Sequence, residues 1–318
     1  MKKSCILICF MLISALSFSQ WILQNPLLQS NTLYSVFFAD ANTGYATGAV
    51  GTIIKTTDAG STWAALTSGT TNDLHSVYFT DVNTGYAVGN SGTILKTSNA
   101  GNTWITLSSG TLNNLNAVYF TDVNTGYAVG NSGTIRKTSN AGSTWTTLSS
   151  GTPNNLNSVY FIGVNTGYAV GDYGTIRKTS NAGSSWSTLL SNTTNTLYSV
   201  YFTDLNNGFT SSSDGGSSGK IYKTSDAGSS WSISLNKGPL QSIYFTDINT
   251  GYAVGYDGMS VLLEGSRISK VKGIDLAEAL KEVSIEGAVG PIDMNGSRYF
   301  DRIERLNTVK DGKIVELK

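Results

Sequence analysis

The chain has 318 residues, of which only 13% are charged, and its 21 Lys and Arg balance its 21 Asp and Glu. A net charge of zero gives no electrostatic footprint for nucleic acid or an anionic membrane surface, so neither is expected as a partner. One His and two Cys are too few for a Cys/His metal cluster.

Residues 1–19 have the features of a secretory signal peptide. Two Lys precede an apolar run over residues 5–16, and small residues come before Gln20. The run is too short to span a membrane, and no second hydrophobic segment follows. We therefore expect an exported protein in the periplasm, at the cell surface or outside the cell. Both Cys lie in the removed segment, so no disulfide is expected.

The six Trp residues lie on one repeat. Their spacings are 42, 41, 41, 41 and 45 residues: Trp21, Trp63, Trp104, Trp145, Trp186 and Trp231. Each period contains four short runs of β-branched and aromatic residues bounded by Asn, Gly, Ser and Asp, which predict strands. In the second repeat these are 74–79, 85–89, 92–97 and 103–107, with the first strand innermost. Four strands in about 41 residues indicate a propeller blade.

A turn motif, Ser/Thr-x-Asp-x-Gly-x-Thr-Trp, precedes five of the Trp residues. Its third position is Asp58, Asn99, Asn140, Asn181 and Asp226 in turn. An Asp or Asn side chain can accept bonds from nearby amides, and Gly adopts a positive φ without steric cost. The motif resembles the Asp-box of BNR repeats. We expect Trp63, Trp104, Trp145, Trp186 and Trp231 to be wedged between adjacent blades.

A second turn, Asp-x-Asn-Thr-Gly, recurs at residues 40–44, 81–85, 122–126 and 247–251. Its alternating oxygen atoms could be interpreted as a calcium loop. Calcium loops usually supply six to eight oxygens, including a bidentate acid, and these repeats contain no Glu. Turns closed by Asp side chains on backbone amides are therefore expected, with no metal.

Five repeats are complete in the sequence. A sixth has its first strand at 240–245 and its second at 251–254, and residues 259–263 are expected to supply its third. Residues 21–23 have the pattern of an unpaired outer strand, and closing the ring with them removes two open edges. We expect an all-β fold, a β-propeller of six four-stranded blades over residues 20–258, followed by a small α+β tail over 259–318.

Residues 21–258 as a whole resemble the Asp-box propellers. The Leu-x-x-Val-x-Phe, Gly-Tyr-Ala-Val-Gly and Lys-Thr-Ser-Asn-Ala-Gly-Ser-Thr-Trp segments are most similar to the photosystem II assembly-factor-like repeat family. Proteins with similar repeats include assembly chaperones, sorting receptors and secreted proteins. The resemblance therefore implies a binding or assembly scaffold rather than one defined chemistry.

A sialidase is the most specific enzymatic interpretation of Asp-boxes. That family uses an arginine triad, a tyrosine nucleophile with a Glu partner and an Asp acid/base, whereas residues 20–258 have only Arg136 and Arg177 and no Glu. A Ser-His-Asp triad would depend on His75, which is expected to lie in an exposed turn after Asp73. We expect a non-catalytic protein without a cofactor. A degenerate sialidase-like glycoside hydrolase and a structural surface protein without a specific ligand are the alternatives.

Recognition is expected where loops differ among repeats. Strand alternation places the Asp-box turns and the turns between first and second strands on one face. The loops between second and third strands, which vary, share the other face with the connections between repeats. The candidate binding residues on this variable face are Asp172, Tyr173, Asp214, Tyr256 and Asp257. Their partner is expected to be a protein or a glycan; solvated turns without a ligand are the alternative.

The composition changes sharply near residue 259. Residues 20–258 carry nine Lys and Arg, eleven Asp and no Glu, whereas 259–318 carry ten Lys and Arg, four Asp and six Glu. Such a shift marks a domain boundary. A helix is expected from Asp275, then an extended stretch over 299–309 and a hairpin turn at Asp311-Gly312.

The tail has a resemblance of its own. Its segments 276–283, 287–292 and 309–315 resemble the C-terminal end of periplasmic branched-chain amino acid binding proteins. Both lobes that form the ligand cleft of that family are absent from this sequence, so we infer no amino acid binding. The tail is expected to be fragment-like, joined to the propeller by gene fusion or a chimeric reading frame.

Overall fold

The computed structural model describes residues 31–215, 219–237, 239–247, 250–255, 260–262, 307–310 and 313–316. These residues form β-strands joined by turns and three short 3-10 turns. None of the helices in this part of the chain has the length and apolar character needed to cross a membrane. Internal contacts divide the chain into two units, residues 1–243 with 254–259, and residues 244–253 with 260–318.

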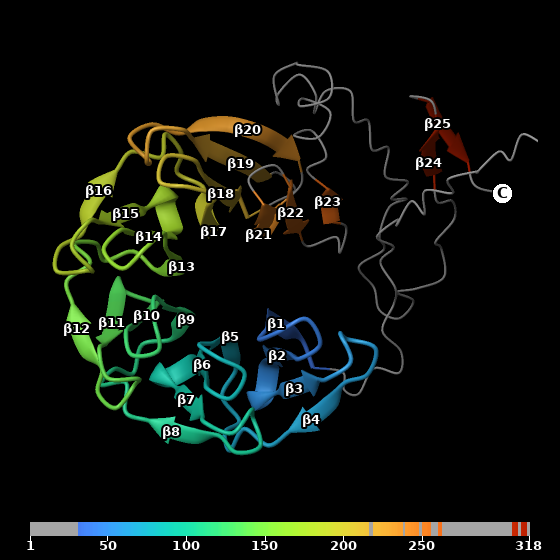
Figure 1. The fold of residues 1–318 in the computed structure, drawn as a ribbon. Helices are drawn as coiled ribbons and strands as arrows, with labels where there is room; N and C mark the ends of the chain where they lie inside the picture. Colours follow the sequence, from blue (N-terminus) through green and yellow to red (C-terminus); the bar gives the residue numbers. More distant parts are fainter. Residues whose placement is uncertain are drawn as a thin grey trace, which may run out of the picture. The chain divides into compact units, whose positions relative to one another are not determined.

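The first unit contains five antiparallel sheets, each of four strands in sequence order (Figure 1). The first sheet consists of β1 (Leu33–Phe38), β2 (Gly44–Gly48), β3 (Ile53–Thr56) and β4 (Ala64–Leu66). The second consists of β5 (Leu74–Phe79), β6 (Gly85–Gly89), β7 (Ile94–Thr97) and β8 (Ile105–Leu107). The third consists of β9 (Leu115–Phe120), β10 (Gly126–Gly130), β11 (Thr134–Thr138) and β12 (Thr146–Leu148).

The fourth and fifth sheets continue this order. The fourth consists of β13 (Leu156–Phe161), β14 (Gly167–Gly171), β15 (Ile176–Thr179) and β16 (Ser187–Leu189). The fifth consists of β17 (Thr196–Phe202), β18 (Gly208–Ser213), β19 (Gly219–Thr224) and β20 (Ser232–Lys237). Three 3-10 turns, η1 (Ala49–Gly51), η2 (Asn90–Gly92) and η3 (Asp172–Gly174), join the second and third strands of the first, second and fourth sheets.

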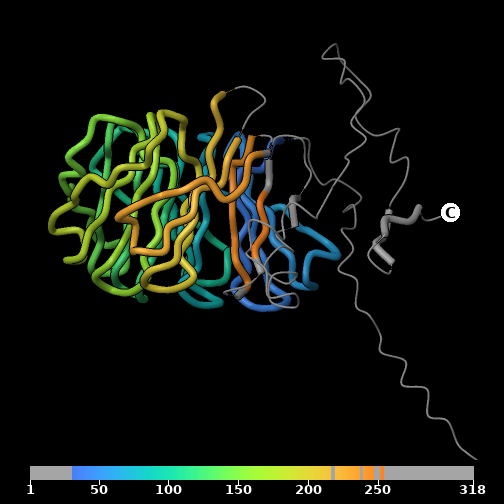
Figure 2. The backbone as a smooth tube through the Cα atoms, turned by 90° about the horizontal axis from the view of Figure 1, so that it is seen from above, coloured from blue at the N-terminus to red at the C-terminus, as the bar shows by residue number. Residues whose placement is uncertain are grey.

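The first strand of each sheet is innermost, as its large side chains on both faces predict. Figure 1 shows the five sheets following one another around a common centre, with β1, β5, β9, β13 and β17 nearest to it. Each of these strands contacts the next one in this series. Seen from the side in Figure 2, the strands run between two opposite faces, where the turns lie.

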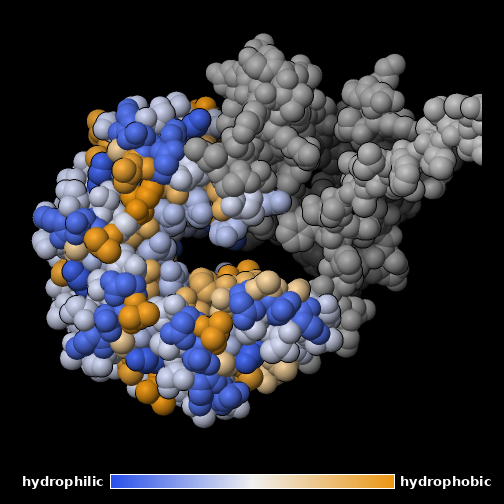
Figure 3. Space-filling view, viewed as in Figure 1, coloured by the Kyte–Doolittle hydropathy of each residue, from blue (hydrophilic) through white to orange (hydrophobic). Residues whose placement is uncertain are grey.

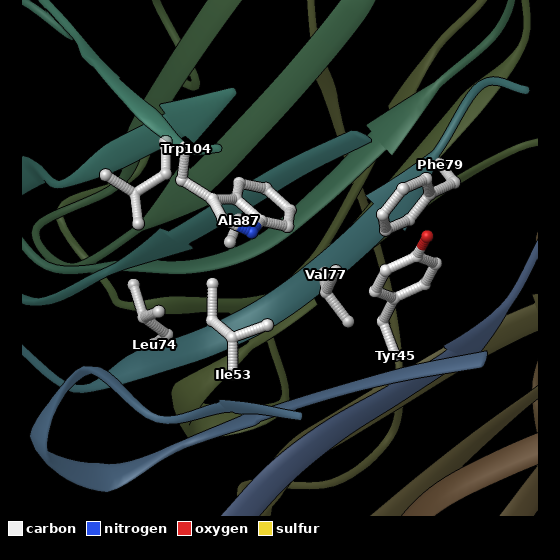
Figure 4. Packing of buried hydrophobic residues seen from close by; sticks show 8 residues of the cluster. Tyr45, Ile53, Leu74, Val77, Phe79, Ala87 and Trp104 are labelled. Atoms are coloured by element: carbon white, nitrogen blue, oxygen red, sulfur yellow. The ribbon is translucent and has the colours of Figure 1, made fainter. Parts of the chain in front are cut away.

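Apolar clusters fill the space between consecutive sheets, and the wedge is confirmed for the four buried Trp residues but not for Trp63, which is half-buried and belongs to none of these clusters. Figure 4 shows one such cluster, in which Tyr45 and Ile53 of the first sheet meet Phe79 and Trp104 of the second. The next two junctions repeat the cluster with Trp145 and Trp186, and the fourth with Trp231. Burial of these rings joins each sheet to the preceding one, because the hydrophobic contribution scales with buried apolar area.

Two strand boundaries and one histidine differ from expectation. The third strand of the second sheet begins at Ile94 rather than residue 92, because residues 90–92 form η2. The fourth begins at Ile105, since the Thr103 amide donates to Asn99 Oδ1 in the preceding turn. His75 is not in an exposed turn: it lies in β5, half-buried, with Nε2 2.7 Å from Asn90 Oδ1.

Five further strands follow. β21 (Leu240–Asp247), β22 (Thr250–Gly255) and β23 (Ser260–Leu262) form a three-stranded sheet in that order, so the expected third strand of the sixth repeat is present. β24 (Asn307–Lys310) and β25 (Lys313–Glu316) form the expected hairpin, with Lys310 opposite Lys313. The strand expected at 21–23 and the helix expected from Asp275 lie outside the described residues.

Candidate functional site

The Asp-box turn is held by one side chain at its third position. Asp58 Oδ1 accepts bonds from the Thr56 hydroxyl and the Thr62 amide, each at 2.8 Å. Oδ2 accepts from the Thr62 hydroxyl at 2.6 Å. These bonds favour the charged carboxylate and lower the pKa of Asp58. In the fifth box, the hydroxyl and amide of Ser230 lower the pKa of Asp226 to about 2.

Asn makes the same turn in the three middle boxes. Asn140 Oδ1 accepts from the Thr144 amide at 2.9 Å, and its Nδ2 donates to the Thr144 hydroxyl at 3.0 Å. The motif predicted a positive φ for Gly142, which is confirmed at 81°. It gave no signal that Ala141, before the Gly, has a φ of 53°. The Ala side chain does not favour this left-handed conformation, so the surrounding turn must impose it.

The second type of turn is closed by Asp on backbone amides, as expected. Asp40 Oδ1 accepts from the amides of Asn42 and Thr43 at 2.8 and 2.7 Å. These bonds lower the pKa of Asp40. The amide of Ala59 in the first Asp-box donates to Asn42 O at 2.9 Å, so the two types of turn share one face of the unit. Within the described ranges, no three His, Cys, Asp or Glu side chains lie close enough to hold a metal ion.

The opposite face carries the loops between second and third strands. The amide of Val50 in η1 donates to Asp73 Oδ1 at 2.9 Å, which ties this loop to the connection between the first two sheets. The middle residue of the loop is left-handed in four sheets: Val50, Ser91, Ser132 and Tyr173, with φ between 54° and 56°. Bulky residues rarely adopt this conformation, so Val50 and Tyr173 are strained.

The five predicted binding residues have different surroundings. Tyr173 is 74% exposed. Asp172 is half-buried, and its carboxylate accepts from Asn155 Nδ2 at 2.9 Å and Asn157 Nδ2 at 3.1 Å. Asp214 is exposed at the end of β18 in the next sheet. The other two candidates, Tyr256 and Asp257, lie outside the described residues.

Tyr173 borders a groove on the fourth sheet, which we call the Tyr173 groove. Its volume is about 710 Å³, and it lies among Thr152, Asn154, Tyr173, Arg177, Leu190 and Thr193. Leu190 is 75% exposed, so an aromatic and an aliphatic side chain reach solvent at one polar groove. A concave site with apolar side chains and several hydrogen-bonding groups is typical of ligand recognition. Sequence reasoning identified Tyr173 and missed Leu190, because Leu190 directly follows the strand β16 and belongs to no variable loop.

Arg136 and Arg177 are structural rather than exposed. Arg177 is 6% exposed; its Nη2 donates to Trp186 O at 2.6 Å and its Nη1 to the Thr188 hydroxyl. Arg136 makes the same contacts with Trp145 and Thr147. Burial lowers the pKa of both guanidinium groups. In the third and fourth sheets, these contacts join the third strand to the outer strand.

Two solved GH74 structures share the fold, and two YCF48 structures match at lower TM-scores. The Niastella koreensis GH74 enzyme matches at a TM-score of 0.58 and 15% identity over 70% of this chain and 44% of that one. The GH74 xyloglucanase from Xanthomonas campestris matches at a TM-score of 0.54 and 11% identity over 71% of this chain and 51% of that one. Two YCF48 structures each match at a TM-score of 0.46 and 18% identity. For YCF48 bound to D1 peptide the match covers 74% of this chain and 94% of that one, and for YCF48 from Cyanidioschyzon merolae it covers 75% and 97%.

Sequence comparison identifies the family. No curated protein matches the chain. The family model described as photosynthesis system II assembly factor YCF48 matches three overlapping ranges, residues 13–112, 65–213 and 103–243. These ranges contain all five complete sheets and both types of repeated turn. The chain therefore belongs to the photosystem II assembly factor YCF48 family of BNR-repeat proteins.

Proposed function

We propose that this protein is an exported, non-catalytic scaffold that binds a partner protein at the Tyr173 groove. The observation that carries the proposal is Tyr173 itself. Its ring is 74% exposed on a residue with a φ of 56°. Such a conformation costs an aromatic residue free energy that the fold does not recover by burying the ring. Leu190 adds a second exposed apolar side chain at the same groove.

A protein partner is favoured over a glycan by the family. Its description is that of an assembly factor, and one YCF48 structure is bound to a D1 peptide. Exposed Tyr side chains contribute a large contact area and a polar group, and they are enriched among residues that dominate protein interfaces. Asp172 helps to hold the loop through Asn155 and Asn157. Asp214, Tyr256 and Asp257 are proposed as further contacts on the variable face.

The scaffold is proposed to be a ring of six sheets. β21, β22 and β23 supply three strands of the sixth, and residues 21–23 supply its outer strand. The tail over residues 259–318 is proposed as a separate α+β segment, and residues 1–19 as a removed signal. Mass spectrometry of the mature chain tests the last point, because an N-terminus at or near Gln20 is expected and an intact Met1 contradicts export.

Tyr173→Gly separates binding from folding. Gly adopts the left-handed conformation without strain, so this variant should unfold no more easily than the natural chain. Its binding to the partner should fall at least tenfold, because the ring is lost. Ser132→Gly is the matched control at the same loop position of the third sheet, with a φ of 55°. The partner is first isolated by its binding to the natural chain. If Tyr173→Gly then binds this partner as tightly as the natural chain does, the proposed site is wrong.

The enzymatic alternative draws on the GH74 fold likeness. Glycoside hydrolysis needs a pair of carboxylates facing a substrate. In the described ranges, Asp40, Asp81, Asp122 and Asp204 accept amide bonds in their own turns, as do Asp58 and Asp226 in theirs. Cleavage of xyloglucan or sialosides by the mature chain would favour the enzyme. Retention on a glycan array without cleavage would favour a glycan partner, and neither activity nor any partner would favour a structural role.

A further inference from the structure

One exposed position is aliphatic in four consecutive sheets. It is the second position of the turn between the first and second strands. The four side chains, which we call the turn-tip side chains, are between 46% and 65% exposed: Val82, Val123, Val164 and Leu205. None of them belongs to the apolar clusters between the sheets. Packing within this unit therefore does not account for them.

The turn that carries Val82 is fixed on both sides of it. Asp81 Oδ1 accepts from the amides of Asn83 and Thr84 at 2.8 and 2.9 Å. Asn83 O in turn accepts from the Ala100 amide of the Asp-box at 2.9 Å, and the same contact recurs in the next three sheets. Val82 is therefore held at a defined point, so a partner that contacts it need order little of the backbone.

The four turn tips lie on neighbouring strands. Their turns directly follow β5, β9, β13 and β17, which contact one another in that order. Just before these turns, a Tyr hydroxyl of one strand donates to a Phe carbonyl of the next at 2.9 to 3.0 Å. In Figure 3, small apolar patches recur around the sheets between hydrophilic residues. Single exposed apolar residues are ordinary, whereas a series on adjacent elements is typical of an interaction surface.

The fold does not require an aliphatic side chain at this position. Ala41 occupies it in the first sheet, where Asp40 closes the turn in the same way. The fifth repeat differs from the others at Asn207 and Phe209 in the same hairpin, yet position 205 changes only from Val to Leu. In the sequence, the sixth repeat has Ile at position 248. Three different aliphatic residues therefore occur at one position that the turn leaves free.

Carboxylates flank the turn-tip side chains. Desolvation opposes the ionisation of Asp81 and Asp122, but bonds from the amides two and three residues further on outweigh it and lower the pKa of both. Among the described residues, neither carboxylate forms an ion pair with Lys or Arg. The lysines of these two sheets donate to Ala carbonyls of the neighbouring Asp-boxes instead. The surface at Val82 and Val123 is therefore both aliphatic and negatively charged.

We propose that the turn-tip side chains and their flanking carboxylates form a docking surface for a protein segment that carries Lys or Arg around an aliphatic patch. This surface lies on the Asp-box face, opposite the Tyr173 groove, so it goes beyond the proposed function. Its charge selects a cationic partner and disfavours an anionic membrane or a second copy presenting the same face. Burial of the exposed apolar area supplies an attraction that salt does not screen.

A synthetic amphipathic peptide of Leu and Lys tests the surface, with the same peptide carrying Glu instead of Lys as its charge control. The Lys peptide should bind the full natural chain, more weakly at higher salt, and the Glu peptide should not bind. Serine at all four turn tips should weaken binding by about tenfold or more: Val82→Ser, Val123→Ser, Val164→Ser and Leu205→Ser. Serine at four exposed aliphatic positions elsewhere is the matched control and should leave binding unchanged: Val50→Ser, Ile105→Ser, Leu112→Ser and Ile233→Ser.

The charges are tested by Asp81→Asn combined with Asp122→Asn. An Asn side chain can accept the same turn amides, so this variant should fold normally. It should bind the Lys peptide about fivefold more weakly, the effect of losing two exposed ion pairs, and with a flatter salt dependence.

Several results would overturn the proposal. These are equal binding of the Lys and Glu peptides, equal losses in the two serine variants, or no saturable binding of the Lys peptide. Self-association, or binding to phosphatidylcholine vesicles, that is lost in the turn-tip variant would assign the surface to a different occupant and overturn it as well. Tyr173→Gly should bind the Lys peptide as the natural chain does, which separates this test from that of the Tyr173 groove.

Discussion

Replacing Trp145 with Ala tests the energetic basis of the fold. The ring is 6% exposed and lies in a cluster with Tyr86 and Ile94 of the preceding sheet. It meets Phe120 edge to face, with ring centroids 6.2 Å apart. Burying a Trp removes about 150–250 Å² from water, roughly 4–6 kcal/mol as an upper bound. Truncation of large core side chains costs about 3–5 kcal/mol, and we expect Trp145→Ala to lie in that range.

The indole nitrogen makes a sharper comparison possible. Trp145 Nε1 is buried without an acceptor among the described residues, as are those of Trp104, Trp186 and Trp231. Trp145→Phe keeps an aromatic ring and removes this donor, so we expect it to cost about 1–2 kcal/mol. Urea unfolding followed by far-UV circular dichroism gives both values. An unchanged midpoint for the Ala variant would refute the wedge, and equal losses for Ala and Phe would show that the junction needs the full volume of the indole and not only an aromatic ring.

Three further predictions concern charged and ionisable groups. Arg177→Leu, which copies Leu95 of the second sheet, should change the free energy of unfolding by less than about 1 kcal/mol in urea, because it removes a buried charge along with its two bonds; a loss above about 3 kcal/mol contradicts this. The pKa of Asp226 is lowered to about 2, so the stabilisation that its charged carboxylate gives to the folded state is complete above the unfolded pKa of about 4 and is lost as pH falls through 2. Asp226→Asn, which copies Asn140, should flatten acid unfolding in this window, and an identical acid profile would be the contrary result. Burial raises the pKa of Tyr127 to about 12, so its contribution is complete below about pH 10 and disappears as pH rises through 12. Ultraviolet titration compares the folded natural chain with Tyr127→Phe at pH 11. The natural chain should show less additional tyrosinate than one exposed tyrosine would contribute, because Tyr127 is still protonated there. Full ionisation of this tyrosine near pH 10 would exclude its burial.

Much of the fold follows from the sequence because its determinants are local. The turn at Asp58 is closed by atoms within six residues of one another, so a motif of that length contains the whole interaction. Strands such as β5 and β6 follow from short runs of β-branched and aromatic residues between such turns. The repeat then predicts that each Trp lies at an equivalent position, which the four buried rings confirm.

The candidate site was less accessible to sequence reasoning. The variable loops pointed to Tyr173, which is exposed, but also to Asp172, whose carboxylate is occupied by Asn155 and Asn157. Leu190 lies at the groove only because β16 pairs with β15, which brings the end of β16 beside the Tyr173 loop. The sequence predicts that His75 lies in a turn, but it lies in a strand and contacts Asn90, fifteen positions away.

The sequence by itself determined the repeat, the order of strands and the chemistry of both turns, since these depend on neighbours a few residues apart. Only the tertiary structure decided which polar side chains are buried and which distant groups they contact. The hydroxyl of Tyr127 reaches a carbonyl 55 residues further along the chain, and the guanidinium of Arg177 is buried by its own outer strand. Burial and pairing of this kind arise when distant segments pack together, because desolvation depends on everything around a group and not on its place in a motif.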